Sequence, residues 1–271
     1  MSEAIAGPAN WQAQNPPRPQ TGPEIPLDPT LPGGYPGRVK ICVIGVPGIP
    51  VGRNNIKDPR LDKTHQLVEA KKKVYAQVDV VGPELLPEAD AVLVSHDRFA
   101  DMILKDLERI DTRLSRDPSP EEEAVLRKLQ AHLENEQPVF TAGLDEAEYL
   151  TVSGHGFETG KPVVVAEDDE LGDPEALLVK AFQGGGYICF LTVGGVENRA
   201  WPIRRGETAA EAAGSIHTAL QKGFIRAEVI GFDDFLAAGG ETEAKRAGKQ
   251  RLEMKNYIVQ DYDILNIRAN K

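Results

Sequence analysis

Two cysteines, a 6% aromatic content and no long apolar run set the first limits on this chain of 271 residues. Cys42 and Cys189 lie inside apolar stretches, where cysteine behaves as a small buried hydrophobe, so we expect neither a disulfide nor a metal pair. The absence of any run of about eighteen apolar residues excludes a transmembrane helix. The first residues lack the basic start and apolar core of a signal peptide, so we expect a cytoplasmic protein.

Positive charge is also scarce, because 31 Lys and Arg face 42 Asp and Glu, a net charge of −11. This balance argues against a protein that coats nucleic acid over its whole surface, and we expect neither a DNA partner nor a membrane partner. The deficit is uneven along the chain. Residues 187–271 hold 12 Lys and Arg against 11 Asp and Glu, a net charge of +1, which leaves room for a local basic face.

Proline and glycine mark the borders of the expected domains. Residues 1–37 contain nine of the 20 prolines, which predicts an extended, disordered tail. The Gln-Gly-Gly-Gly run at 183–186 predicts a flexible joint. These borders divide the chain into the tail, a first domain over residues 38–186 and a second domain over residues 187–271.

The first domain opens with a buried strand at 39–44, after which a loop starts at Gly45. In an NTPase this loop would read G-x-x-x-x-G-K-[ST], so that backbone N–H groups and a Lys hold phosphates and a hydroxyl holds Mg²⁺. Residues 45–55 read GVPGIPVGRNN, without Gly-Lys-Ser/Thr, and Gly52 and Arg53 stand nearest to those positions. The prolines of this loop also remove N–H donors.

The remaining patterns of the first domain alternate between strand and helix. Two amphipathic runs at 100–114 and 121–133 predict a helical hairpin, with Ser119 as the N-cap of its second helix. Further helices are expected over residues 64–73 and 173–182, and further strands over residues 74–81, 91–95 and 161–166.

The densest pattern lies in the second domain, at residues 212–230. An Ala-rich helical run ends at a glycine and a strand follows, in which Phe224, Arg226, Glu228 and Ile230 are expected to share one face. Other strands are expected over residues 187–193 and 198–204 and near Tyr257 and Ile264, with a short helix over 233–238.

This stretch, together with AWPIRRG at 200–206 and AGKQRLEMKNYIVQDYDIL at 247–265, resembles the C-terminal TGS (DUF933) domain of the YchF/Obg-like ATPase family. The resemblance implies a β-grasp, ubiquitin-like domain. TGS domains of related translation factors and synthetases meet RNA or ribosomal surfaces, so the resemblance implies an RNA, ribosome or protein partner. The side chains available for phosphate contacts and stacking are Arg199, Arg204, Arg205, Lys222, Arg226, Lys249, Arg251, Lys255 and Tyr257.

The resemblance reaches the first domain through DPRLDK at 58–63, Asp-x-x-Gly at 79–82 and the helical hairpin at about 99–136. It implies a truncated P-loop-like α/β domain from which the first helix and the switch region are deleted. The positions that it carries over from the family's nucleotide site are Gly45, Gly52, Arg53, Asp79, Gly82 and Glu170. With the phosphate-binding Lys and the Mg²⁺-holding hydroxyl absent, we expect no catalytic residue, metal or cofactor.

Three interpretations remain open at this point. The first is a YchF-like protein that has lost its nucleotide site and acts as a non-catalytic adaptor for RNA, the ribosome or a protein. The second is an ATPase of that family that still binds ATP or GTP with Mg²⁺ and hydrolyses it slowly. The third is a module that binds only proteins, with the helical hairpin as its docking surface.

Overall fold

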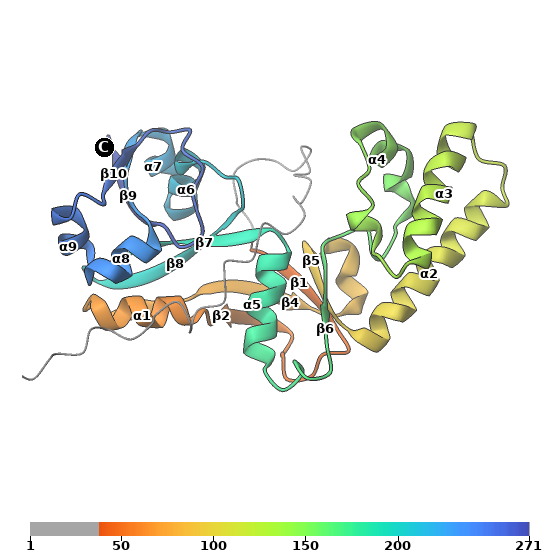
Figure 1. Ribbon diagram of the computed structural model, residues 1–271, viewed down its shortest axis with the longest axis horizontal. Coiled ribbons are helices and arrows are strands. Elements are labelled where there is room, and N and C mark those ends of the chain that lie inside the picture. The colour runs from red at the N-terminus through yellow and green to blue at the C-terminus, as the bar shows by residue number, and fades with distance from the viewer. Residues whose placement is uncertain (1–37, 271) are drawn as a thin grey trace, which may run out of the picture.

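The computed structural model describes residues 38–270, so the expected tail at 1–37 lies outside the described residues. The described residues form two β-sheets with helices around them (Figure 1). The strand order is β2-β4-β1-β5-β6 in the first sheet and β10-β9-β11-β7-β8-β3 in the second. The architecture is therefore mixed α/β.

The first sheet consists of four parallel strands and one antiparallel edge strand, β2 (Gly52–Ile56), which pairs with β4. Strand β5 (Ala91–Ser95) is buried along its whole length, as expected of a strand with both faces covered. Helix α5 (Pro174–Gly184) packs on one face, and the 3₁₀ helix η2 (Pro83–Glu88) lies on the other. The other parallel strands are β1 (Lys40–Ile44), β4 (Ala76–Val81) and β6 (Val163–Ala166).

Between β5 and β6 the chain forms a projection that we call the helical arm, residues 96–160 (Figure 1). The predicted hairpin is present as α2 (His96–Leu114) and α3 (Pro120–Glu134), and Ser119 caps α3 as predicted by accepting the Glu122 N–H. The arm also contains α4 (Glu146–Val152), η3 (Val139–Thr141) and η4 (Ser153–His155).

A buried carboxylate fixes the arm at its base. Asp106 of α2 is fully buried and accepts hydrogen bonds from the Thr159 hydroxyl at 2.7 Å and from the backbone N–H groups of Glu158 and Thr159 at 2.8 Å. Arg109 donates to the same carboxylate at 2.8 Å. All the bonding capacity of this charge is used, so α2 is held against the end of the arm.

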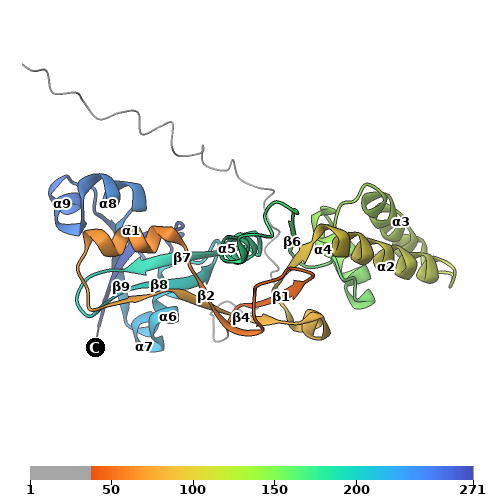
Figure 2. The same cartoon turned by 90° about the horizontal axis from the view of Figure 1, so that it is seen from below.

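The second sheet has helices on both faces (Figure 2). Helices α6 (Ala209–Ile216) and α7 (Thr218–Lys222) lie on one face, while α1 (Pro59–Leu67), α8 (Phe232–Ala238) and α9 (Glu241–Arg246) lie on the other. Its strands are β7 (Tyr187–Thr192), β8 (Glu197–Arg204), β9 (Phe224–Ile230), β10 (Arg251–Glu253), β11 (Ile264–Ala269) and β3 (Lys72–Val74).

Two details of the second sheet differ from the sequence-based expectations. The strand expected near Tyr257 is wrong, because β10 lies at Arg251–Glu253 and Tyr257 belongs to the following loop. Strand β9 does not present Phe224 and Ile230 to one core: Phe224 packs with the cluster beneath α6, while Ile230 packs on the opposite side. A register shift between Arg268 and Ala269, opposite the start of β9, accounts for this change of face.

The helix expected at 64–73 is also misplaced, since α1 starts at Pro59 and ends at Leu67. Asp58 accepts the Arg60 N–H and caps the helix, and a proline at the first helical position needs no hydrogen bond there. The lysines that follow form strand β3, which pairs in parallel with β8. The sequence 72–81 therefore supplies β3 to the second sheet and β4 to the first.

The expected flexible joint at 183–186 is wrong as well. Helix α5 continues through Gly184, and a Cβ atom on Gly184 would lie 2.3 Å from the Val164 Cγ2 atom. A Cβ atom on Gly185 would lie 2.8 Å from the Cβ atom of Ala91. These glycines permit close packing of α5 on the first sheet, and one hydrophobic cluster continues from there into the second sheet.

Helix α1 is tied to the second sheet by Arg60. Its guanidinium bonds the buried Asp58 at 2.7 Å and Asp261 at 2.8 Å, and it lies 3.7 Å from the ring centre of Tyr262. Tyr262 has a left-handed φ of 63°, which this packing holds in place. Arg60 and its partners thus join segments about two hundred residues apart. Among residues 38–270, no helix is long and apolar enough to cross a membrane.

We predict that Arg60→Met lowers the free energy of unfolding by about 2–3 kcal/mol, because Asp58 stays buried without its main charge partner. Chemical denaturation followed by circular dichroism measures the change. The control is Arg98→Met, whose pair with Asp101 has both side chains more than half exposed, and we expect less than about 0.5 kcal/mol there. Equal effects of the two variants would contradict the role assigned to Arg60.

Candidate functional site

The loop after β1 is the place where a nucleotide's phosphates would have to bind. It starts at Gly45, whose φ is +73°, and a Cβ atom there would lie 2.2 Å from the Ser95 Oγ atom. The chain then crosses the end of β4 and enters strand β2 at Gly52. No helix starts between Gly45 and Asn55, so the loop does not lead into a helix N-terminus that could bind phosphate.

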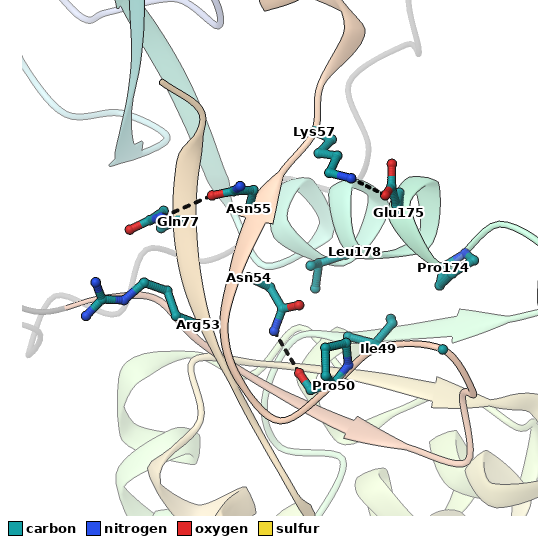
Figure 3. A pocket seen from close by; sticks show the side chains of 11 residues that line it. Ile49, Pro50, Arg53, Asn54, Asn55, Lys57, Gln77, Pro174, Glu175 and Leu178 are labelled. Carbon is teal, nitrogen blue, oxygen red and sulfur yellow. Dashed lines mark hydrogen bonds and ion pairs between the residues drawn. The ribbon is translucent and has the colours of Figure 1, made fainter. Parts of the chain in front are cut away.

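The side chains of this loop bind the loop itself. Asn54 donates from its side-chain amide to the carbonyl oxygens of Pro50 at 2.7 Å and Gly52 at 3.0 Å. Pro47 and Pro50 have no N–H to offer. Arg53 is exposed in β2, lacks an ion pair within residues 38–270, and extends away from Ile49 in Figure 3.

Asp79 and Gly82 do not join Gly45. In the parallel pairing of β1 and β4, Asp79 lies opposite Lys40, which is five residues before Gly45. At about 3.3 Å per residue this offset is roughly 16 Å along the strand. Asp79 instead lies opposite Arg53 in β2 and 3.6 Å from the Arg38 guanidinium, while the Gly82 carbonyl accepts from the Cys42 thiol at 3.4 Å.

Glu170 follows β6 and therefore lies at the same sheet edge as Gly45. It is occupied by local contacts: its carboxylate bonds the Lys180 ammonium at 2.7 Å and accepts the Glu167 N–H at 3.0 Å. The hydrogen bond from Lys180, followed by that from the Glu167 backbone, lowers the pKa of Glu170. Glu170 thus braces its loop and stays ionised. Gly45 and Glu170 therefore lie at the end of the sheet where the parallel strands β1 and β6 finish. Arg53 and Asp79 lie level with the start of β1.

A hollow of about 350 Å³ lies beside this loop, between β2 and the start of α5 (Figure 3). Lys57 reaches into it but pairs with Glu175, and Asn55 pairs with Gln77 at 3.1 Å. The lysine charge is therefore compensated before any anion arrives. Within residues 38–270, no group of three His, Cys, Asp or Glu side chains could hold a metal ion.

The cations proposed for RNA contact fall into two groups in the structure. The first group is engaged within the protein. Arg204 lies 3.4 Å from Asp90 and over the ring of Tyr187, Lys249 pairs with Asp234 at 3.1 Å, and Arg199 pairs with Glu197 at 2.9 Å. These side chains support the packing of the second sheet and its helices.

Arg251 also belongs to this engaged group. Its guanidinium lies 3.2 Å from Glu253 and donates to the Tyr257 hydroxyl at 3.0 Å. Tyr257 in turn donates to the buried Asp263 at 2.7 Å. Burial and then the bond to Asp263 raise the pKa of Tyr257, so its hydroxyl stays protonated as a donor. Tyr257 is thus half-buried and held by Arg251 and Asp263, so its ring is not a free surface on which a base could stack.

The second group has no ion pair within residues 38–270 and is exposed. Its members are Arg205, Lys222, Arg226 and Lys255. Sequence reasoning missed two further exposed and unpaired lysines, Lys71 and Lys72, at the edge strand of the same sheet, because they were assigned to a helix in the first domain. The Val-Tyr pair that follows the lysines is the local signal that could have indicated a strand there.

Comparison with known proteins locates the chain among its relatives. Residues 187–270 match the family model YchF-GTPase_C, described as a protein of unknown function (DUF933). The ribosome-binding ATPase YchF of Haemophilus influenzae is 34% identical over 200 residues, covering 54% of this chain and 55% of the relative. Obg-like ATPase 1 of Rattus norvegicus is 52% identical over 81 residues, covering 30% of this chain and 20% of the relative.

The fold has a solved counterpart in the YchF GTPase of Schizosaccharomyces pombe, with a TM-score of 0.64 at 17% identity, covering 88% of this chain and all of that one. This likeness concerns the fold alone. The chain spans about half the length, or less, of the curated relatives that it matches. Taken together, the C-terminal family match and the curated relatives show that this chain carries the C-terminal domain of the YchF/Obg-like ATPase family.

Proposed function

We propose that this protein is a YchF-related adaptor that binds RNA or the ribosome through its C-terminal domain without using a nucleotide. One observation carries the proposal: the loop after β1 leads into the antiparallel strand β2 instead of a helix. Phosphate binding in such folds relies on the N–H groups and dipole of a helix that starts there. The chain also lacks the lysine that would neutralise the phosphates.

The remaining positions of the nucleotide site give no substitute for that helix. Asp79 would have to stand beside the phosphate loop to hold a metal, but it lies opposite Lys40 at the start of β1. Phosphoryl transfer depends almost entirely on positioned charges. We therefore assign no catalytic residue, cofactor or metal to this protein.

In this proposal residues 38–186 are a truncated P-loop-like domain with an inserted helical arm, and residues 187–271 are a TGS domain. The strand order β2-β4-β1-β5-β6 supports the first assignment. The second is supported by the β7–β8 hairpin, by β11 lying parallel beside β7, and by α6 packed across one face, as in a β-grasp. The domain border falls at 186/187 even though β3 pairs with β8.

The ribosome as partner is supported by the names of relatives, which are described as ribosome-binding ATPases. A ribosome partner implies a cytoplasmic location. The exposed, unpaired cations Arg205, Lys222, Arg226 and Lys255 are the side chains best able to contact phosphates, because no carboxylate within residues 38–270 neutralises them.

The alternative function is a YchF-type ATPase that binds ATP or GTP with Mg²⁺ through an altered loop. The names of the relatives favour it, since they are ATPases and a GTPase. A third function, binding only proteins, differs from the first in needing no phosphate contacts. The two experiments that follow separate these three.

We predict that isothermal titration with millimolar ATP or GTP and Mg²⁺ gives no binding heat, because no helix continues from the loop after β1 and residues 45–55 contain no lysine to hold the phosphates. The same titration on an intact YchF ATPase serves as the positive control. A saturable isotherm in the micromolar range would establish the ATPase alternative instead.

We predict that the double variant Arg205→Glu, Lys255→Glu loses co-sedimentation with ribosomes at low salt, because two phosphate contacts become repulsive. The control is Arg53→Glu, Arg116→Glu, which changes the net charge equally on exposed, unpaired cations outside the second sheet. Wild-type binding should weaken steeply with salt. Salt-insensitive binding, or equal loss in the two variants, would argue against an RNA contact at this face.

A further inference from the structure

The helical arm has a shallow, open hollow on its surface that the proposed function does not use. It has a volume of about 420 Å³ and is lined by Asp145, Glu146, Ala147 and Leu150. We call it the α4 hollow. Leu150 is 62% exposed and its neighbour Tyr149 is 44% exposed, so two large apolar side chains face solvent on one short helix.

The geometry of α4 keeps these side chains outside the core. Residues three and four apart lie on one face of a helix, which places Glu146, Ala147 and Leu150 together. The opposite face carries Val152, which is buried with α3. Asp145 and Glu148 form a capping box, with bonds of 2.8 and 3.0 Å, that fixes the start of the helix. Leu150 therefore cannot turn inward without breaking the helix.

The helical arm that carries the hollow is strongly negative. Residues 96–160 contain 7 Lys and Arg against 15 Asp and Glu, a net charge of −8 out of −11 for the whole chain. Most cations of the arm are already paired, for example Lys128 with Glu148 and Arg113 with Glu122. By contrast, Glu146, which lines the hollow, has no ion pair within residues 38–270.

We propose that the α4 hollow binds a basic segment of a protein partner, whose apolar side chain packs against Leu150 while flanking Lys or Arg side chains pair with Glu146 and Asp145. An acidic surface around exposed apolar groups complements such a segment and repels RNA. The inference goes beyond the RNA or ribosome contact proposed for the C-terminal domain and does not depend on it. The protein would then have a basic surface on its C-terminal domain that prefers anionic partners and an acidic surface on the helical arm that prefers cationic ones.

In the experiment the full chain is titrated into a short, fluorescently labelled helical peptide made only of Leu and Lys. Binding is measured as the fluorescence anisotropy of the peptide. We expect saturable binding that weakens with salt, and no binding of the matching peptide made of Leu and Glu. Leu150→Ser should weaken binding about tenfold, because it removes a central apolar contact. Glu146→Gln should weaken it about threefold by removing one charge.

Matched controls come from the same arm. Leu104 of α2 is 59% exposed, and Glu108 of α2 is exposed without an ion pair within residues 38–270. Leu104→Ser and Glu108→Gln should leave peptide affinity unchanged, and circular dichroism should be identical for all four variants. Three results would each overturn the proposal: equal losses in the control variants, displacement of the peptide by an RNA oligonucleotide, or a concentration-dependent dimer that Leu150→Ser dissolves.

Discussion

The extended segment 72–81 is the constraint on which the arrangement of this molecule depends. Its first part, β3, pairs in parallel with β8, and its second part, β4, pairs with β1 and β2. A short run of backbone, with only Tyr75 between its two strands, therefore supplies a strand to each sheet and links the two sheets directly. Arg60 reinforces the same junction by bonding Asp58 and Asp261 while it stacks on Tyr262. The expectation of a flexible joint considered only the glycines at 183–186 and overlooked this second connection.

This junction also places the two surfaces of interest at different parts of the molecule. The four cations proposed for phosphate contact lie on the second sheet, its helices and its loops, while the acidic helical arm projects from the first sheet (Figure 1). Where a nucleotide would bind, after β1, the nearby cations are engaged in local ion pairs, Lys180 with Glu170 and Arg98 with Asp101. The two proposed binding surfaces therefore lie on different parts of the molecule, as an adaptor with two partners would need.

Local patterns predicted much of the fold. The apolar run at 39–44, the paired amphipathic helices and Ser119 as a cap follow from short-range chemistry, and the structure contains all three. The wrong predictions concern segments whose secondary structure or register is set by contacts between residues far apart in the sequence. The lysines at 71–73 suit a helix, but pairing with β8 makes the last two part of a strand. The mismatch between Asp79 and Gly45 depends on strand register, which motif spacing does not contain. For the same reason the engaged cations, such as Arg204 with Asp90, could not be separated from the free ones.

The central claim is that the loop after β1 has lost its hold on phosphate. A crystal structure determined from crystals grown with millimolar ATP or GTP and Mg²⁺ tests it most directly. The account predicts that residues 45–51 run into β2 as they do here, with Asn54 still bonded to Pro50 and no nucleotide density beside Gly45. A nucleotide bound at Gly45, with a metal ion on its phosphates, would contradict it.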